Sequence, residues 1–535
     1  QPLLVQQMPA TGLTFAGGPA QIACDPSGWV TSVRHQESPG LSYLAGAVVE
    51  GLQVDGQALG PQEPEMLVDS DEVEFVHTWP GRLRLVVRHT FAVGWGVRLA
   101  FSSLAEVTQS VGRAELRLQP QPEVVPWALT LGITTAYALL PARGSGPVLG
   151  AVLRRGSVAG ATERGLELSP FELRAGARYV AQLQWDWYPT PRDFGQERYP
   201  EAPSALYVSA GESVQVRVDE DVAVLAPDDV DVTQTPETMD LVAEPGRYSF
   251  ELRSARGTTA FEVQWLTPVE QFLADLVPGL LSGRRTAAGV VKLAGVADAL
   301  LVQSALARNQ IDDQDEAAEA LDLFTARLSS PEPAQPAPLG PLEVAFLCRE
   351  FDRLGDADLL AEASALLLGL PTPQPGLGLA ATQLCLRLIV SERPVQPVLS
   401  RLSWLLARLD GRAPLSVPER AAELELMAVT FTGAGVAGAG ATPAADLVDR
   451  LAGLGALLGA GLIGRAVAPR PVDELSHLAT VCQLLPDGLS ARLTAQWGCS
   501  AQALAARALP ELVARLQGRP VSRAHAWLVL GLQTS

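Results

Sequence analysis

The first half of the chain is a series of short runs in which apolar and polar residues alternate. In the clearest case, residues 72–91, two alternating runs flank Pro80-Gly81-Arg82. A three-residue loop would place Trp79 opposite Leu83 and leave one apolar and one polar face, whereas a two-residue loop would mix the faces. The three-residue register also pairs Phe75 with Val87 and Glu74 with Arg88. The pattern therefore predicts a β-hairpin in that register.

Turn-forming residues separate many other runs of strand length before residue 265. Asp25-Pro26-Ser27-Gly28, for example, is a four-residue turn signal between apolar runs at 21–24 and 29–33. Many short strands with few helical intervals are typical of an antiparallel β-sandwich. We therefore predict an antiparallel β-sandwich domain over residues 1–265.

The periodicity changes after Trp265 to the 3.6-residue spacing of amphipathic helices. Thr267-Pro268 predicts the first helix, with threonine as the cap and proline at the first position. Further helices are predicted at 287–308, 312–328, 341–354, 357–369, 379–392, 395–410, 416–429, 443–466, 472–484, 488–496, 500–517 and 521–532. Paired short helices form either an open solenoid or a closed (α/α) toroid, and the lack of a regular repeat favours the toroid. Residues 266–535 are thus a predicted helical domain with a proline-rich break at 329–341.

Aromatic residues are concentrated in the first half. All seven tyrosines lie at or before Tyr248, and the helical half has only Trp404, Trp497 and Trp527 among the ten tryptophans. Because aromatic faces and their polar neighbours suit ligand recognition, a binding surface is expected on the sandwich.

The densest aromatic and polar segment is residues 184–199. Trp185 and Trp187 share one face of a strand, and Asp186 points to the other. Indole faces can stack on sugar rings while neighbouring polar groups meet the hydroxyls, so this segment is the candidate carbohydrate site. The alternative is that both tryptophans belong to the sandwich core. The candidate ligand-binding residues are Trp185, Asp186, Trp187, Tyr188, Arg192, Asp193 and Tyr199.

The sequence predicts no metal site and no cofactor. His35, His77 and His89 are interpreted mainly as core residues, because no carboxylate joins them at a recognisable spacing. Residues 218–246 contain nine acidic residues without the calcium-loop pattern, which favours a solvated acidic loop. Two G-x-G-x-x-G runs, 433–438 and 459–464, lack a preceding strand, so tight helix packing or a flexible loop is favoured over a dinucleotide site.

Charge and cysteine content restrict the partners. With 59 acidic and 40 basic side chains the net charge is −19, which opposes general nucleic-acid binding. The five cysteines are scattered without a CxxC pair, and at most Cys482 and Cys499 could pair. No apolar run is long enough to cross a membrane. Gln1 at the start, in place of methionine, favours an exported or cell-envelope protein over a cytoplasmic one.

A strand-rich half, such as residues 72–101, followed by a helical half resembles glucoamylase-type and disaccharide-phosphorylase-type carbohydrate enzymes. The resemblance implies a galactose-mutarotase-like supersandwich, then an (α/α) toroid that carries the catalytic acids. Carboxylates available for an acid–base pair are Glu343, Glu350, Asp352, Glu423 and Glu425. Some of these are the polar faces of helices, and the helical half lacks the aromatics of a sugar cleft, so none is assigned to catalysis.

Three functions remain open from the sequence. The leading hypothesis is a carbohydrate-recognising protein that uses the sandwich. A glycoside hydrolase or phosphorylase-like enzyme is the first alternative. A non-catalytic assembly protein, which binds a protein partner or a second copy of itself, is the other.

Overall fold

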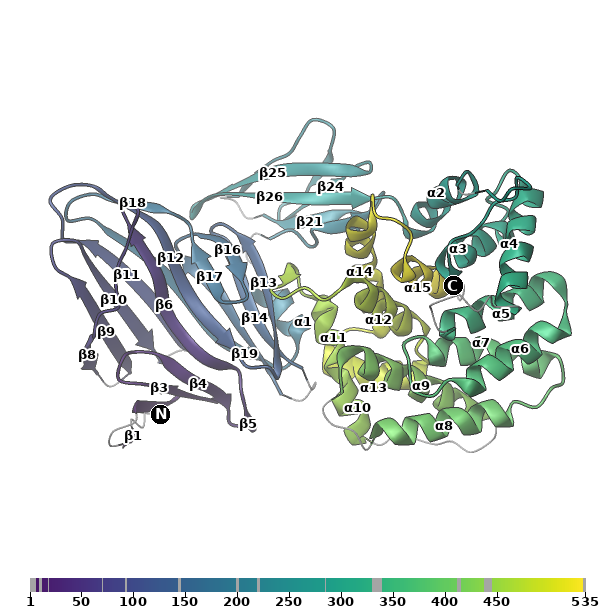
Figure 1. Ribbon diagram of the computed structural model, residues 1–535. Coiled ribbons are helices and arrows are strands. Elements are labelled where there is room, and N and C mark those ends of the chain that lie inside the picture. The colour runs from purple at the N-terminus through teal and green to yellow at the C-terminus, as the bar shows by residue number, and fades with distance from the viewer. Residues whose placement is uncertain are drawn as a thin grey trace. The chain divides into compact units, whose positions relative to one another are not determined.

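A computed structural model describes residues 6–8, 12–17, 19–69, 71–91, 94–142, 146–198, 202–218, 222–283, 285–329, 339–410, 415–436 and 445–532. The chain folds as strands followed by helices, as the sequence predicts (Figure 1). It divides into two compact units. The β unit contains residues 1–265, 455–469 and 496–499, and the helical unit contains residues 266–454, 470–495 and 500–535.

Three antiparallel sheets form the larger part of the β unit. The nine-stranded sheet has the order β27-β13-β14-β15-β19-β11-β10-β9-β8. Its strands are β8 (Glu65–Val68), β9 (Glu72–Trp79), β10 (Leu83–Thr90), β11 (Trp95–Ser103), β13 (Val124–Leu131), β14 (Thr134–Pro141), β15 (Val148–Arg155), β19 (Arg178–Tyr188) and β27 (Arg465–Ala466). A six-stranded sheet contains β6 (Leu44–Val54), β7 (Gln57–Ala58), β12 (Gln109–Pro120), β16 (Val158–Thr162) and β17 (Gly165–Leu168), with β18 (Phe171–Leu173) beside β12. A five-stranded sheet contains β1 (Gln6–Met8), β2 (Gly12–Gly17), β3 (Ala20–Cys24), β4 (Val30–His35) and β5 (Ser38–Ser42).

Two smaller sheets complete the β unit over a separate apolar core that includes Phe250 and Trp265. One has the order β20-β26-β25-β22, and the other β21-β24-β23. Their strands are β20 (Tyr207–Ser209), β21 (Val214–Arg217), β22 (Ala223–Leu225), β23 (Asp231–Gln234), β24 (Thr238–Val242), β25 (Gly246–Ser254) and β26 (Gly257–Leu266).

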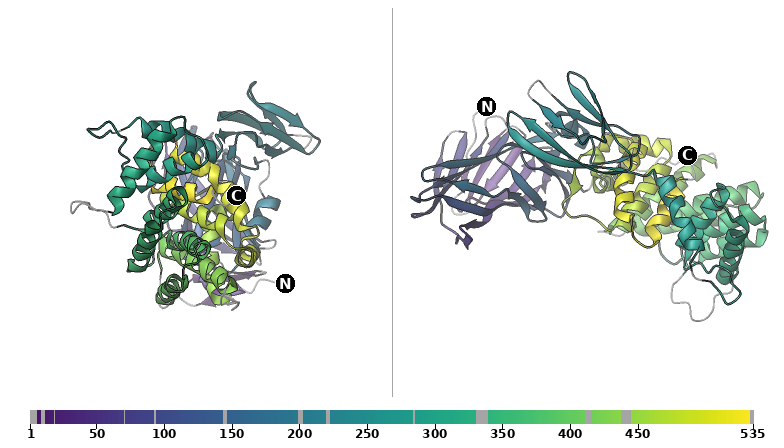
Figure 2. Two further views of the ribbon diagram at one scale, coloured as in Figure 1. Left: turned by 90° about the vertical axis from the view of Figure 1, so that its right-hand side faces the viewer. Right: turned by 90° about the horizontal axis from the view of Figure 1, so that it is seen from above.

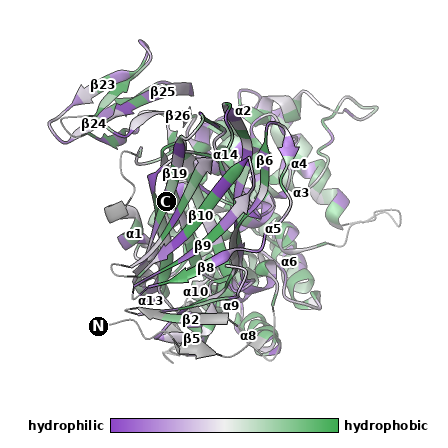
Figure 3. Cartoon of the chain, turned by 90° about the vertical axis from the view of Figure 1, so that its left-hand side faces the viewer, coloured by the Kyte–Doolittle hydropathy of each residue, from purple (hydrophilic) through white to green (hydrophobic). Residues whose placement is uncertain are grey.

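The hairpin of β9 and β10 has the predicted register. Leu83 pairs with Trp79, and the other predicted pairs are Val87 with Phe75 and Arg88 with Glu74. One face is apolar and packs in the sandwich core, and the other is mainly polar but includes Val76 and Val86. Figure 3, coloured by hydropathy, shows polar and apolar residues alternating along these strands. The predicted turn at residues 25–28 is also present, closed by a hydrogen bond from the Gly28 N–H to the Asp25 carbonyl at 3.1 Å.

Residues 455–469 belong to the β unit although they follow ten helices in sequence. β27 pairs with β13, where Ala466 lies opposite Trp127. The Trp127 indole N–H donates to the Ile463 carbonyl at 3.1 Å, and its ring lies against Gly459. The predicted helix 443–466 is therefore wrong beyond its first part. Helix α10 (Ala445–Ala452) and α11 (Leu454–Leu457) give way to a short 3₁₀ turn at Gly459–Gly461.

The helical unit is a closed (α/α) toroid. Six inner helices pack in sequence, α3 (Val296–Ala307), α5 (Pro341–Leu354), α7 (Leu377–Val390), α9 (Val417–Val436), α12 (Val472–Leu484) and α15 (Arg523–Gly531), and α15 packs against α3. Partners of these helices are α2 (Val269–Leu281), α4 (Gln314–Ser329), α6 (Ala357–Gly369), α8 (Gln396–Asp410), α10 and α14 (Ala501–Leu516). Figure 2 shows these helices from two other sides. The ring selects the toroid over the solenoid.

Most predicted helices are found, and two of them begin later than predicted. The first predicted helix, α2, begins at Val269 and has Pro268, not Thr267, as its N-cap. Residues 287–295 are not helical, because Gly289 has a φ of +87° and Arg285 forms a β-bridge with Val291. Residues 231–234 and 238–242 of the predicted acidic loop form β23 and β24. Most of the proline-rich break, 330–338, lies outside the described residues.

His89 lies in the sandwich core with 1% of its surface exposed, as predicted. Its Nδ1 accepts a hydrogen bond from the Trp95 indole at 3.1 Å, and its buried Nε2 has no partner among the described residues. Burial lowers the pKa of His89 to about 4. The imidazole is therefore neutral in the folded protein across the physiological range.

His89 should make the folded protein sensitive to acid. The unfolded chain binds a proton at this residue near pH 6.5, and the folded protein does so only near pH 4, so stability falls as the pH drops from about 6.5 to about 4. The expected loss is about 3 kcal/mol in the free energy of unfolding. Urea unfolding at several pH values should show a smaller loss for His89→Gln, which keeps an acceptor for Trp95. Parallel pH profiles for the two proteins would contradict the assignment.

Candidate functional site

A pocket of about 390 Å³ opens in the β unit between β6, β9 and two loops. Two tryptophans, Trp29 and Trp79, line it together with His77. The remaining lining residues are Ser27, Val49, Glu50, Gly51, Leu52, Leu59, Gly60, Pro61, Gln62 and Leu85. This set combines aromatic faces, aliphatic side chains and a few polar groups, as small-molecule sites do. We call it the Trp29–Trp79 pocket.

The turn after β3 positions Trp29. Asp25 Oδ1 accepts hydrogen bonds from the backbone N–H groups of Ser27, at 2.9 Å, and Trp29, at 3.0 Å. Gly28 has a φ of +89° and lies so close to the Phe75 ring that a Cβ would be 2.8 Å from it. Only glycine suits that backbone and that space. The turn therefore holds Trp29 at a fixed place beside β9.

Strand alternation and one loop position the other two rings. His77 and Trp79 lie on the same face of β9, and their rings are nearly parallel at 17° with centroids 6.2 Å apart. The Trp79 indole N–H donates to the Gly60 carbonyl at 2.8 Å, and His77 Nδ1 lies 3.3 Å from the Gln62 carbonyl oxygen. Burial lowers the pKa of His77, and the hydrogen bond to Gln62 opposes that shift only in part. The ring is therefore a neutral hydrogen-bonding group at neutral pH.

A carboxylate stands beside the Trp29 ring. Glu50 on β6 accepts two hydrogen bonds from Arg117 Nη1 on β12, at 2.9 and 3.0 Å. The guanidinium of Arg117 lies 5.6 Å from the centroid of the Trp29 ring. Glu50 remains partly exposed, with 30% of its side chain accessible, so its other lone pairs can accept from a ligand.

The tryptophans predicted to bind a ligand share one face of β19, as expected, and that face points into the sandwich. Trp185 is 1% exposed and stacks on Trp95 at 5.2 Å. Trp187 is partly buried against the same core, with Tyr43 and His35 packed edge-on at 4.9 Å. A sugar could not stack on Trp185 unless the core opened.

The rest of the predicted segment has mixed surroundings. Tyr188 is buried in a second core with Phe194 of α1 (Pro191–Arg198), and Asp186 points to the other face of β19, as predicted. Asp193 Oδ2 accepts from the backbone N–H of Thr190 at 3.0 Å, and exposed Arg192 donates to the Gly498 carbonyl at 3.3 Å. Tyr199 lies outside the described residues. A ligand-binding role for this segment stays a prediction.

The helical unit contains a buried carboxylate with several donors. Glu425 on α9 accepts from the backbone N–H groups of Gly376 and Gly378, both at 2.9 Å, at the start of α7. His477 Nε2 on α12 contacts the same carboxylate. A Cβ at Gly378 would lie 2.5 Å from the Glu425 Cβ, so glycine is required for this close approach. The contact joins three inner helices.

A second pocket, of about 360 Å³, lies beside Glu425. Its polar lining consists of Thr382, Gln383, Gln483, Asp487 and Gln502, with Glu425 at one side. The other lining residues are aliphatic or small, and none is aromatic. This pocket offers amide and carboxylate groups but no flat apolar surface for a sugar ring.

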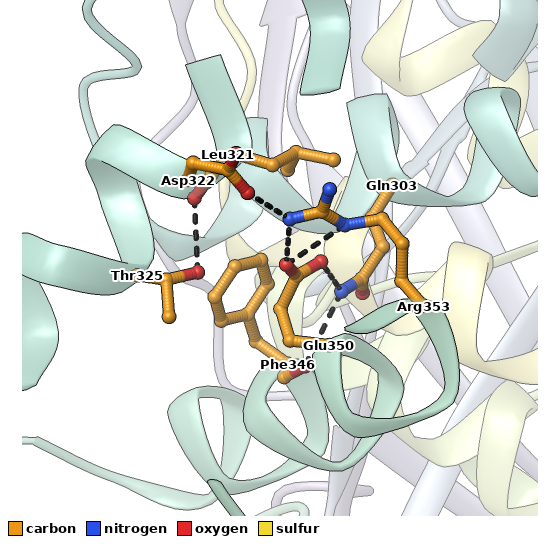
Figure 4. A network of polar contacts seen from close by, with 7 residues as sticks. All are labelled: Gln303, Leu321, Asp322, Thr325, Phe346, Glu350 and Arg353. Atoms are coloured by element: carbon orange, nitrogen blue, oxygen red, sulfur yellow. Dashed lines mark hydrogen bonds and ion pairs between the residues drawn. The ribbon is translucent and has the colours of Figure 1, made fainter. Parts of the chain in front are cut away.

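The other carboxylates considered for catalysis make structural contacts. Figure 4 shows Glu350, which is 0% exposed, between Gln303 of α3 and Arg353, whose guanidinium also contacts Asp322 of α4. Glu343 caps the start of α5 through the Gly340 N–H at 2.8 Å, and burial raises its pKa. Asp352 pairs with Arg387 at 3.0 Å, and Glu423 pairs with Arg450 at 2.6 Å. Each of these carboxylates thus has a structural contact within the helical unit.

One buried cation in the toroid stands apart. Arg349 on α5 is 6% exposed, and none of its three guanidinium nitrogens has a hydrogen-bond partner within the described residues. Burial, reinforced by the nearby charge of Arg387, lowers its pKa to about 9. The guanidinium therefore stays charged at neutral pH inside the ring.

The described residues contain neither a candidate metal site nor a membrane-spanning helix. No group of three or more His, Cys, Asp or Glu there could hold a metal ion, and Asp228, Asp229 and Asp231 of the acidic stretch are exposed. Gly459 and Gly464 approach Trp127 and the Ala128 carbonyl closely, which is packing against β13 and not against a helix. The five cysteines are free, so Cys482 and Cys499 do not pair. None of the described helices is both long and apolar enough to span a bilayer.

Sequence reasoning missed the Trp29–Trp79 pocket because its parts are far apart in the chain. Trp29 follows a turn, Trp79 ends a strand, and Gln62 lies in a loop. The available signal was weak: both tryptophans stand at strand ends, where a side chain of the inner face can reach the rim. Only the pairing of sheets brings them together.

Comparisons with known proteins bear on the fold. No protein-family model matches the chain, and no curated protein matches it in sequence. Among solved structures, a polysaccharide lyase aligns with 90% of this chain and 92% of its own, at 12% identity and a TM-score of 0.63. A heparinase III aligns with 49% of this chain and 42% of its own, at 8% identity and a TM-score of 0.21, which is too low to indicate a shared fold. The first likeness shows a shared fold.

That shared fold refines the resemblance drawn from sequence. The sequence pointed to glucoamylase-type and phosphorylase-type enzymes, and the solved neighbour is a carbohydrate-active enzyme of a different type. What holds is the coarser statement that a β domain precedes a helical domain, as in that enzyme.

Replacing Glu425 by glutamine should destabilise the helical unit. The amide loses one acceptor oxygen, so a backbone N–H of α7 is left facing an NH₂ group in a buried site. We expect the free energy of unfolding to fall by about 3 kcal/mol in chemical denaturation. Glu319→Gln, at an exposed position of α4, should change it by less than about 0.5 kcal/mol. Equal effects of the two substitutions would disprove the structural role of Glu425.

Proposed function

We propose that the protein binds a polysaccharide through the Trp29–Trp79 pocket of the β unit. The observation that carries the proposal is that two indoles, a neutral imidazole and a partly exposed carboxylate line one pocket of about 390 Å³. Of the surfaces described, this one combines an aromatic lining with polar groups that can form further hydrogen bonds.

The chemistry of the lining fits a sugar. The C–H face of a pyranose is apolar and can lie against an indole, which adds contact beyond simple area burial. Ring hydroxyls need acceptors and donors at the rim, and Glu50, Ser27 and His77 supply them. Arg117 is already paired with Glu50, so its charge is not available to a ligand, and the pocket suits a neutral sugar.

The shared fold supports the same class of ligand. The neighbour that aligns with 90% of this chain is a polysaccharide lyase. The same fold is thus found in a protein that is named for its action on polysaccharides. The fold does not choose between binding and catalysis. An exported or cell-envelope location remains part of the proposal.

A catalytic role is the second candidate: the pocket beside Glu425 has no aromatic surface for a sugar ring, but two carboxyl groups line it. Glycosidic cleavage by hydrolysis needs two carboxyl groups across the substrate, and Glu425 and Asp487 line one pocket. Glu425 is committed to backbone donors and His477, which leaves exposed Asp487 as the group free to act.

The assembly alternative is favoured by one surface of the toroid. Near the end of α7, Leu386, Ile389 and Val390 are 57%, 49% and 83% exposed. Apolar residues gathered in this way are typical of partner-binding surfaces. A protein partner or a second copy of the chain would cover them.

Trp79→Ala and Trp29→Ala should each weaken polysaccharide binding. Loss of one stacking face is expected to raise the dissociation constant by about tenfold, measured by affinity electrophoresis and calorimetry on a panel of polysaccharides. Trp404→Ala is the matched control, because Trp404 is an exposed tryptophan of the helical unit. Trp187→Ala tests the other surface predicted on the sandwich.

The pattern of the four variants decides between the surfaces. Weaker binding only in the Trp79 and Trp29 variants supports the pocket, and weaker binding only in the Trp187 variant moves the site to β19. Unchanged thermal unfolding is required of each variant. A parent protein that binds no polysaccharide of the panel would refute the proposal.

The catalytic alternative makes a separate prediction. A polysaccharide that binds should be shortened on incubation, and Asp487→Asn should reduce the rate of chain cleavage at least about tenfold while binding is retained. Chromatography of the products measures the cleavage. An unchanged rate in the Asp487 variant would exclude that carboxyl group as acid or base.

A further inference from the structure

The outer face of the nine-stranded sheet carries a group of arginines. The inner residues of β9, β10, β11 and β19, such as Phe75, Val87, Leu99 and Leu183, belong to the sandwich core. The residues between them point to the opposite face, away from the Trp29–Trp79 pocket. On that face lie Arg84, Arg88, Arg98, Arg155 and Arg178, which we call the arginine face.

Strand register arranges these side chains in two rows. In the first row Arg88 lies beside Arg98, Arg98 beside Gln182, and Gln182 beside Arg155. The second row, four residues along the strands, has Arg84 beside Ser102 and Ser102 beside Arg178. Because neighbouring strands are about 4.8 Å apart, the cations of a row are spaced by about 5 to 10 Å.

An apolar row runs between the two cationic rows. It consists of Val76, Val86, Ala100 and Val180, paired in this order across the four strands. Val76 is 5% and Ala100 2% exposed although both are on the outer face. We attribute this to the long arginine stems on either side, which lie over small neighbours. Only Val86 and Val180 of the row are partly exposed, so the face has guanidinium groups along both sides of a narrow apolar strip.

The charges of this face are not balanced. Arg88 pairs with Glu72 at 3.4 Å and with Glu74 at the β9 edge of the sheet. Within the described part of the chain, Arg84, Arg98, Arg155 and Arg178 form no ion pair. Many arginines elsewhere are paired, among them Arg117, Arg247, Arg253, Arg285, Arg353, Arg387 and Arg450. The four unpaired arginines therefore give this face an excess of positive charge, in a chain whose net charge is −19.

Arg98 lies at the centre of the unpaired positive charge of the arginine face. Its Nε is buried and has no partner among the described residues. Desolvation lowers the pKa of Arg98, and the charges of Arg178, Arg88 and Arg155 add to this effect. The neighbours of Arg98 therefore repel it more than Glu74 attracts it, and an anion placed over the row would relieve that repulsion.

We propose that the arginine face is a second binding surface, for a polysaccharide that carries carboxylate or sulfate groups. A single exposed arginine binds an anion weakly, so useful affinity requires several to act together on a chain with repeated charges. The partly exposed Val86 and Val180 can contact the C–H face of a sugar ring, and the guanidinium groups on both sides can reach the anionic groups. The described residues of the face include no aromatic ring for stacking nucleotide bases, which favours an acidic polysaccharide over a nucleic acid.

The test replaces the four unpaired arginines in the full chain by glutamine: Arg84→Gln, Arg98→Gln, Arg155→Gln and Arg178→Gln. The control replaces four exposed arginines elsewhere in the β unit: Arg34→Gln, Arg164→Gln, Arg174→Gln and Arg247→Gln. Both variants change the net charge equally. The probes are polygalacturonate for carboxylates, dextran sulfate for sulfates, neutral dextran, and single-stranded DNA.

We expect the parent to bind one or both acidic polymers at low ionic strength and to release them as salt is added. The first variant should bind at least about tenfold more weakly, and the control should match the parent. The acidic polymer that binds more tightly shows whether the face prefers carboxylate or sulfate groups. A set of four Arg→Lys substitutions, which keeps the charges, should retain most of the binding and provides the test if the glutamine variant fails to fold.

Three outcomes would overturn the proposal: no binding of either acidic polymer, equal losses in the glutamine variant and its control, or preferential binding of DNA. The result is independent of the Trp29–Trp79 pocket. Trp79→Ala lies on the other face of β9 and should leave the salt-dependent binding of acidic polymers unchanged.

Discussion

The antiparallel register of β9, β10, β11 and β19 governs every surface of interest on the β unit. Side chains alternate strictly between the two faces of a sheet, so one register assigns Phe75 to the core, Trp79 to the pocket rim and Arg88 to the outside. A shift by one residue would exchange all of these environments at once. The three-residue loop at 80–82 fixes that register where β9 meets β10. Core packing and ligand chemistry are thus two consequences of one pairing.

In the helical unit, polar groups are buried inside a ring of helices, where each needs a hydrogen-bond partner. Glu425 satisfies backbone donors at the start of α7 and also contacts His477 of α12, while Glu350 connects α3, α4 and α5 through Gln303 and Arg353. Buried ionic contacts of this kind contribute specificity of packing more clearly than they contribute stability. They explain why acidic residues in a carbohydrate-enzyme-like fold do not by themselves indicate catalysis.

Sequence patterns predict those features that depend on near neighbours. The hairpin register at 72–91 and the helices at 341–354, 357–369 and 472–484 follow from alternation, caps and turn residues. Alternation also places Trp185 and Trp187 on one face, but it does not reveal that this face is the inner one, because aromatic residues occur on both core and ligand surfaces. The Trp29–Trp79 pocket depends on contacts between distant segments, which no local pattern encodes.

The strand β27 has a consequence for the order in which the molecule is made. During synthesis, β13 emerges more than three hundred residues before the segment that pairs with it. Until residue 466 has left the ribosome, β13 has an open edge and the Trp127 indole lacks its partner, Ile463. An open strand edge is a site for wrong pairing with other chains. The β unit, although encoded first, is therefore completed only when most of the helical unit already exists.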